Sequence, residues 1–240
     1  MKTFFAKNAG RLLVAAMLSS AGVTGLVRAE DAAKPAAPPV RFRPQTKDAT
    51  SVRVTGGSRG SGESLVTLDV LAPDEIGLTT QEQPSLFWFQ SKPANAKFEL
   101  TLLQDNKVKP IVQVQIDRST KAGIQRLKLA DYHAKLEAGV EYQWVIALVA
   151  DPENRSKDLV ASGVIKRIEP TADLKTKLAS ATAGSTAGIY ADAGIWYDAL
   201  ATLSDQMDAD PSNQTLRQSR ADLLRQVGLK TAADSELASK

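Results

Sequence analysis

The stretch Leu136–Val149 reads LEAGVEYQWVIALV, in which a turn containing a glycine leads into the longest apolar strand that the sequence predicts. From Tyr142 onward this strand is apolar at nearly every position, and therefore on both of its faces. Leu86–Phe89 (LFWF) has the same character. Strands that are apolar on both faces are buried on both sides. We therefore expect two central strands in the region between residues 51 and 170.

Shorter runs around these two strands alternate hydrophobic with polar residues. They are centred on Leu68, Leu100, Val114 and Lys128. Such alternation places one face of a strand on a core and the other face in water. Turn sequences such as Asp151-Pro-Glu-Asn154 separate the runs. About seven short strands over roughly 115 residues predict a β-sandwich for residues 51–170.

The spacing from Leu136 to Tyr142 resembles the tyrosine corner of immunoglobulin-like and fibronectin type III domains. In that motif the hydroxyl of a buried tyrosine is bonded back to nearby backbone. Trp88 would match the core tryptophan of the fibronectin pattern, and the chain contains no cysteine, which also fits the fibronectin-like variety. The resemblance implies an immunoglobulin/fibronectin type III-like β-sandwich.

Residues 171–240 change to a composition rich in Ala, Leu, Asp, Gln and Arg, with leucines at helical spacing. Gly194 and Gly228 lie 34 residues apart, and Ala199 and Ala233 each follow five residues later. This pattern, closing at Pro211, resembles a tetratricopeptide repeat. The tryptophan and leucine expected early in the first helix of that repeat are missing, so a plain helical bundle is the alternative. The predicted fold class is α+β, with the β region first.

The first 29 residues read as a secretory signal peptide. A positively charged start precedes an uncharged, mostly apolar stretch from Leu12 to Leu26, and Val27-Arg28-Ala29 offers a cleavage site. An uncleaved anchor is the alternative, although small polar residues dilute the apolar run. We expect cleavage after Ala29 and a periplasmic or secreted protein of a Gram-negative-type bacterium. Residues 30–50 are rich in Ala and Pro and predict a flexible linker.

Charge and composition narrow the range of partners. Residues 1–29 carry four of the 30 basic residues and none of the 27 acidic ones, so cleavage takes the net charge from +3 to −1. A near-neutral chain gives no reason to expect a nucleic-acid partner. We expect no transmembrane segment after cleavage, and no metal or cofactor, because cysteine is absent and His133 is the only histidine. His133 is interpreted as a surface or locally bonded residue.

One catalytic pattern is present, Gly56-Gly57-Ser58-Arg59-Gly60, which matches the G-x-S-x-G of a nucleophile elbow. That chemistry needs a strand-to-helix turn and a histidine base, whereas the segment after Ser58 alternates like a strand and offers only His133. A glycine-permitted loop before the first core strand is therefore preferred, with an exported serine hydrolase as the alternative. Acidic residues such as Asp69, Asp74 and Asp151 are interpreted as solvated turn charges, and no catalytic residue is assigned.

Several stretches together resemble a known bacterial family. They are Gly56–Gly60, Leu71-Ala72-Pro73, Gly77–Thr80, Pro84–Phe89, Tyr142–Ser156 and Gly163–Arg167. This set is similar to the family catalogued as domain of unknown function 928, over about residues 53–230. The resemblance implies an exported protein and carries no activity or catalytic residues.

The functional prediction is a non-enzymatic interaction or accessory module of the cell envelope, which binds another envelope or sensor protein. Its partner contacts are expected around Trp196 and Tyr197 or at the loops at one end of the sandwich; the alternative is that both aromatic residues are buried. Glycan binding by the sandwich is a further alternative, although Trp88 and Trp144 lie in segments that look buried. The sequence predicts neither an oligomeric state nor how the two regions dock.

Overall fold

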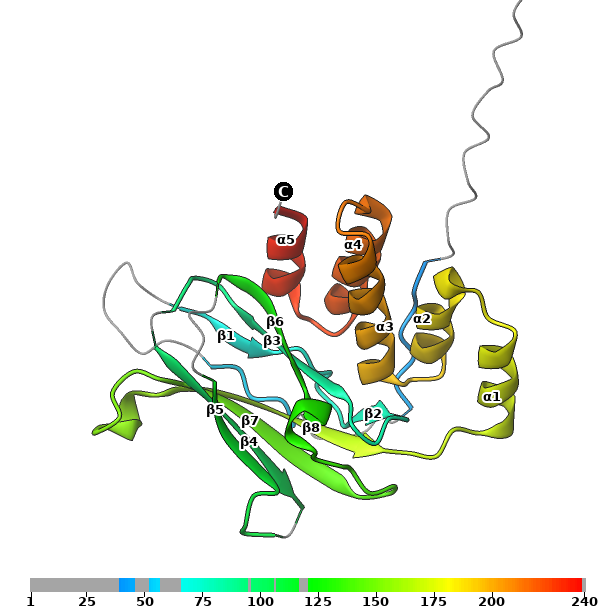
Figure 1. Ribbon diagram of the computed structural model, residues 1–240. Coiled ribbons are helices and arrows are strands. Elements are labelled where there is room, and N and C mark those ends of the chain that lie inside the picture. The colour runs from blue at the N-terminus through cyan, green and yellow to red at the C-terminus, as the bar shows by residue number, and fades with distance from the viewer. Residues whose placement is uncertain are drawn as a thin grey trace, which may run out of the picture. The chain divides into compact units, whose positions relative to one another are not determined.

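The computed structural model of the chain describes residues 39–45, 52–56, 66–94, 96–105, 107–116 and 121–238. Within these residues eight strands come first and five α-helices follow, so the mixed α+β class is confirmed (Figure 1). The strands are β1 (Leu68–Val70), β2 (Gly77–Thr79), β3 (Ser85–Gln90), β4 (Lys97–Gln104), β5 (Val112–Ile116), β6 (Gly123–Lys128), β7 (Glu141–Val149) and β8 (Leu159–Arg167). The helices are α1 (Ala172–Ala179), α2 (Ala183–Asp192), α3 (Trp196–Ala209), α4 (Gln214–Gln226) and α5 (Lys230–Ala238), with short 3₁₀ helices at Leu129–Tyr132 (η1) and Arg155–Lys157 (η2).

The strands form two sheets. The larger sheet has the order β2-β8-β7-β4-β5, and the smaller has the order β1-β3-β6. Neighbouring strands are antiparallel except β2 and β8, which run parallel. The two segments that are apolar on both faces, β3 and β7, occupy inner positions of their sheets, which confirms the expectation of two central strands.

The core between the two sheets follows the predicted alternation. Phe98, Leu100 and Leu102 of β4 are buried, while the residues between them are only half-buried. Trp88 of β3 lies against Phe98, with ring centroids 6.0 Å apart. All six residues of β3 are buried, because one face of the strand packs in the core between the sheets and the helices cover the other face. On the helix-covered face, Arg126 of β6 pairs with Asp205 of α3 at 2.5 Å. The smaller sheet therefore has protein on both faces.

The backbone contact that the tyrosine corner predicts is present. The hydroxyl of Tyr142 accepts a hydrogen bond from the backbone N–H of Glu137 at 3.0 Å, and Gly139 between them has φ of 81°. Glycine adopts this conformation at no steric cost. The strand order, with its parallel β2–β8 pair, does not establish an immunoglobulin or fibronectin type III topology, so that part stays a prediction.

The helices follow one another through short connections. Gly194 separates α2 from α3 with φ of 72°, and Gly228 separates α4 from α5 with φ of 80°. The small residues of the proposed repeat, Ala199 and Ala233, are both fully buried. These features agree with helix pairs joined at glycine, but they do not establish a tetratricopeptide repeat, which also stays a prediction.

Strands and helices share a single hydrophobic cluster, which runs from Leu68 and Trp88 through Trp144 to Trp196 and Leu224. The described residues accordingly belong to one compact unit. The sequence change at residue 171 marks where strands give way to helices inside this unit. Within the described residues, no helix has the length and apolar character required to cross a membrane.

Residues 39–45 differ from the expected linker. Val40 is buried in the common core, Phe42 packs edge-on against Trp196 with centroids 5.0 Å apart, and the backbone N–H of Arg43 donates to Ala191 at 3.0 Å. Alternate apolar residues give this short segment a buried side, which the surrounding Ala and Pro concealed in the sequence. We call residues 39–45 the strap. The predicted signal peptide, including Ala29, and the rest of the predicted linker lie outside the described residues.

Candidate functional site

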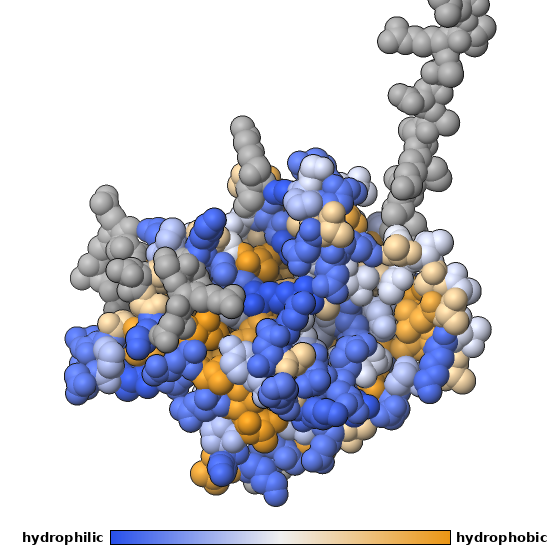
Figure 2. Space-filling model, viewed as in Figure 1, coloured by the Kyte–Doolittle hydropathy of each residue, from blue (hydrophilic) through white to orange (hydrophobic). Residues whose placement is uncertain are grey.

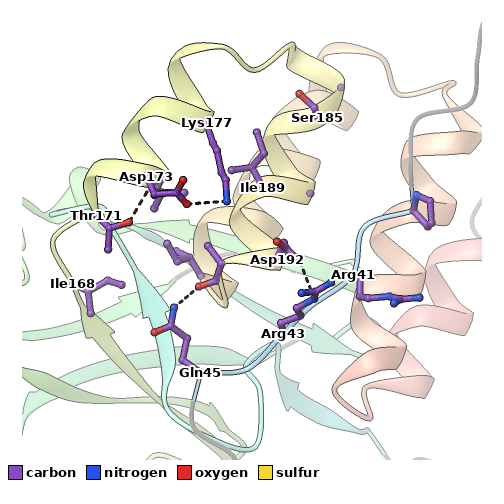
Figure 3. Close-up of a pocket in the computed structure, with 16 residues that line it drawn as sticks. Arg41, Arg43, Gln45, Ile168, Thr171, Asp173, Lys177, Ser185, Ile189 and Asp192 are labelled. Carbon is purple, nitrogen blue, oxygen red and sulfur yellow. Dashed lines mark hydrogen bonds and ion pairs between the residues drawn. The ribbon is translucent and has the colours of Figure 1, made fainter.

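A groove with a volume of about 830 Å³ lies between the strap, α1 and α2 (Figure 3). Its apolar lining comes from Ile168, Leu174, Ile189 and Ile195, and its polar lining from both walls. Hydrophobic surface over α1 and α2 is also visible on the face drawn in Figure 2. We call this cavity the α1–α2 groove.

Helix α1 forms one wall and is held by few contacts. Thr171 caps it, because its side chain accepts from the backbone N–H of Leu174 at 3.2 Å, and Asp173 adds a negative charge to the first turn. Both features favour a helix start at this position. Only Leu174 of the eight α1 residues is buried. The wall is therefore a short helix anchored mainly by one leucine.

Helix α2 forms the facing wall and leaves room beside its backbone. Thr182 and Ser185 form a capping box at its start. Gly184 and Gly188 lie one turn apart, and a Cβ atom added at either residue would meet nothing within 4 Å. The packing of the described residues therefore does not require glycine at either position. The gap beside α2 is thus open to a side chain or backbone from elsewhere.

Charged groups line the groove. Lys177 Nζ lies 2.8 Å from Asp173, and Arg43 Nε lies 2.8 Å from Asp192. The hydrogen bond to Asp173, together with the charges of Asp173 and Asp192, raises the pKa of Lys177. Arg41 also lines the groove and makes no ion pair with any described residue. Three cations against two carboxylates leave one positive charge in excess, screened by solvent at these exposed positions.

Trp196 and Tyr197, around which a partner contact is expected, are both buried, which confirms the alternative for these two side chains. Trp196 Nε1 donates to the carbonyl of Leu71 at 2.8 Å. Tyr197 accepts from Trp144 Nε1 at 2.8 Å and donates to the carbonyl of Val164 at 3.3 Å. The start of α3 is inserted against both sheets, and the two aromatic residues fix it there.

The next residue, Asp198, carries no functional signal in the sequence. Its buried carboxylate accepts from Thr79 Oγ1 at 2.6 Å, from the N–H and hydroxyl of Thr80, and from Gln81 Nε2 at 3.3 Å. Burial raises the pKa of Asp198, and these hydrogen bonds oppose the rise. The donors lie almost 120 residues away in sequence, so no local pattern could have revealed the contact.

A smaller pocket of about 360 Å³ lies beside this carboxylate. It is polar, and its lining includes Gln81, Ser85, Arg126, Lys128, Tyr190 and Asp198. The acceptor atoms of Asp198 are already taken by Thr79, Thr80 and Gln81, and Arg126 is bonded to Ser85 and Asp205. The polar groups of this pocket therefore act mainly between parts of the chain.

Of the two catalytic candidates in the sequence, Ser58 and His133, only His133 lies within the described residues. Ser58 lies outside the described residues, so the serine hydrolase alternative stays a prediction. His133 is exposed and ends η1 in a left-handed conformation with φ of 54°, in agreement with a surface histidine. Trp88 and Trp144 are buried, which removes them as glycan-stacking surfaces. Within the described ranges, no three carboxylate or histidine side chains are grouped to hold a metal ion.

One of the acidic residues interpreted as solvated turn charges is buried instead. Asp69 lies in β1 and is 8% exposed, so the interpretation is wrong for this residue. Burial raises the pKa of its carboxyl group, while a hydrogen bond with Thr55 and the charge of Arg53 oppose the rise. Asp74 is exposed as expected and pairs with Arg53 at 2.7 Å.

The sequence matches the family described as Domain of Unknown Function (DUF928) over residues 54–237. The chain belongs to this family. The resemblance expected from the sequence is thereby confirmed over most of the chain. The start of α3 packs against stretches that carry the DUF928 resemblance. The carbonyl of Leu71 accepts a hydrogen bond from Trp196, and Gly77 lies beside Tyr197. Thr79 and Thr80 donate hydrogen bonds to Asp198.

Other comparisons add no function to this DUF928 protein. No curated protein sequence matches it significantly. Among solved structures, one similarity is to the crystal structure of a multi-domain immunophilin from Arabidopsis thaliana, with 7% identity, a TM-score of 0.19, and coverage of 82% of this chain and 98% of that one. A TM-score this low does not indicate a common fold, so nothing is transferred from the immunophilin.

Proposed function

We propose that this protein is an exported, non-enzymatic interaction module of the cell envelope, and that a partner protein binds it at the α1–α2 groove. The groove itself carries the proposal. It combines an apolar floor, an open helix backbone at Gly184 and Gly188, and the cation Arg41, which pairs with no acidic group among the described residues. Interfaces between proteins commonly have an apolar centre and a polar rim.

The partner contact then lies away from Trp196 and Tyr197, because their side chains are inside the protein. The immunoglobulin-like sandwich and the repeat-like helices, both module types that commonly bind other proteins, belong to the same proposal. Export rests on the signal-peptide pattern of residues 1–29, which would place the mature chain in the periplasm or outside the cell.

Export is tested by expressing the full chain with a C-terminal tag in a Gram-negative bacterium and sequencing the N-terminus of the fractionated protein. We expect a periplasmic product that begins at Glu30. A cytoplasmic product that retains Met1 would contradict this part of the proposal.

Docking is tested in cells of the bacterium that encodes this chain, with a photo-crosslinking amino acid at position 184, where there is free space. The control places the same amino acid at Gln218, an exposed residue of α4 away from the groove lining. We expect a discrete adduct from position 184 only, lost when Gly188→Trp fills the groove. Equal adducts from both positions, or none from 184, would exclude this docking site.

A further inference from the structure

The strap is bound by the helices as an extended peptide would be. Gln226 of α4 holds its backbone with both ends of one amide: Oε1 accepts from the N–H of Phe42 at 2.8 Å, and Nε2 donates to the carbonyl of Val40 at 2.9 Å. Next to them, the N–H of Arg43 donates to the carbonyl of Ala191 at 3.0 Å. All three bonds use strap backbone, so another sequence in the same conformation could make them.

Side chains of the strap alternate between the helices and the outer surface. Val40 is 9% exposed and Phe42 lies edge-on to Trp196, whereas Arg41 and Arg43 are exposed and line the α1–α2 groove. An extended chain presents every second residue to the same side. The helical surface therefore selects an apolar residue followed, two positions later, by an aromatic one.

The helices approach the strap closely at one backbone position. A Cβ atom on Gly194 would lie 2.7 Å from the carbonyl oxygen of Arg43 and 2.7 Å from Cγ of Gln45, and the φ of Gly194 is 72°. The side chain of Gln45 also donates to the carbonyl of Ala193 at 2.6 Å. The glycine between α2 and α3 thus provides the space in which a second chain segment lies.

We propose that the surface formed by α2, α3 and α4 is a receptor for an extended peptide of a partner protein with the pattern apolar-x-aromatic, and that the strap occupies this receptor in the free protein. The inference rests on the proposed function as an interaction module and names the chemistry of its partner. The partner segment replaces the strap and makes the same bonds to Gln226 and Ala191. Its flanking residues reach the adjoining α1–α2 groove.

The strap has the properties of an exchangeable occupant. It is a short segment held by a few backbone bonds, two apolar side chains and the exposed polar contacts of Arg43 and Gln45, and such segments open at a lower free energy than a core strand. Because it belongs to the same chain, its effective concentration is of the order of millimolar, which a competing peptide must overcome. Weakening the strap should therefore strengthen binding in trans.

The test uses the full mature chain and a fluorescent peptide that copies residues 37–47. Binding is followed by fluorescence anisotropy to the wild type and to Phe42→Ala, whose strap loses its contact with Trp196. We expect the peptide to bind Phe42→Ala at least ten-fold more tightly than the wild type. A peptide with alanine at both apolar positions, 40 and 42, should bind neither protein.

Two further variants identify the receptor surface. Adding Gln226→Ala to Phe42→Ala should weaken peptide binding at least ten-fold, while Gln218→Ala, another exposed glutamine of α4, should leave it unchanged. Circular dichroism checks that each protein is folded. If Phe42→Ala is not folded, Phe42→Leu replaces it, and the peptide should again bind the variant more tightly than the wild type. Equal affinity for wild type and strap variant, or no effect of Gln226→Ala, would overturn the inference. If position 184 gives crosslinks but the peptide does not bind, the peptide receptor is excluded and docking at the α1–α2 groove stands. If the peptide binds but position 184 gives no crosslinks, the receptor stands and docking at the α1–α2 groove is excluded.

Discussion

The indole N–H of Trp144, in the middle of β7, donates a hydrogen bond of 2.8 Å to the hydroxyl of Tyr197 at the start of α3. Both side chains are almost completely buried. Burial raises the pKa of Tyr197, so its hydroxyl stays protonated and donates in turn to the carbonyl of Val164. This chain of two hydrogen bonds ties the first turn of α3 to the larger sheet.

Replacing Tyr197 by phenylalanine should therefore destabilise the protein. The ring would still fill its space, but the Trp144 N–H would lose its acceptor in a buried place. Leaving a buried donor unsatisfied costs about 1–3 kcal/mol. The free energy of unfolding, measured in urea, should fall by this amount. Tyr132→Phe, at a tyrosine that is 37% exposed, is the matched control and should change it by less than about 0.5 kcal/mol; equal effects would contradict the role of the buried bond.

Gly77→Ala should destabilise the same junction by steric overlap, without removing a hydrogen bond. A Cβ atom at this position would lie 2.5 Å from Cε2 of Tyr197 and 3.2 Å from Cδ of Pro73. Overpacking of a filled core costs about 1–3 kcal/mol. Gly188→Ala is the control, because it meets no neighbour and lies inside α2, where alanine gains about 0.5–1 kcal/mol over glycine. The midpoint temperature of thermal unfolding should thus fall for Gly77→Ala and rise for Gly188→Ala. A shift of both midpoints in the same direction would be inconsistent with the packing described.

The strands could be predicted from the sequence because their signals are local. The alternation around Leu100 and the apolar runs of β3 and β7 each report burial within a few residues. The turn before Tyr142 likewise joins residues five apart, and its hydrogen bond is present as the pattern implies.

The docking of the helices could not be predicted in the same way. Trp196 and Tyr197 look the same in sequence whether they face water or a sheet, and only the distant Leu71 and Val164 decide between the two. The strap was missed because one valine and one phenylalanine among prolines and arginines carry too weak a pattern for a strand. The α1–α2 groove lies between the strap and two helices that are far from it in the chain, so no sequence motif marks it.

The stability of the protein should depend on pH through Asp198. Burial raises the pKa of its carboxyl group above the value of about 4 expected in the unfolded chain. The folded state then binds the proton more tightly than the unfolded state, so this contribution is complete below about pH 4 and is lost as the pH rises through the pKa of the folded state.

Asp198→Asn carries no titrating group at this position and isolates the effect. We subtract the free energy of unfolding of Asp198→Asn from that of the wild type. This difference should be largest near pH 4 and should decrease toward pH 8. Urea unfolding at several pH values measures this difference, in which the contributions of other groups, such as the buried Asp69, cancel. A difference that grows with pH would mean that the hydrogen bonds from Thr79 and Thr80 outweigh burial.

The pair Arg220–Glu236 should hold α5 to α4, and removing one partner should cost more than removing both. The two side chains are 13% and 7% exposed, lie 2.5 Å apart, and Arg220 also donates to Ser204 of α3 at 3.1 Å. Glu236→Leu leaves a buried guanidinium uncompensated and should lower the free energy of unfolding by about 3 kcal/mol. The double variant Arg220→Met/Glu236→Leu should recover most of this loss, because no buried charge then remains. The exposed pair Arg225–Asp234 is the control, and Asp234→Ala should cost less than about 1 kcal/mol. Arg220→Met and Glu236→Leu are also measured singly. If the loss in free energy of unfolding of the double variant equalled the sum of the two single losses, the pair would not act as a coupled unit.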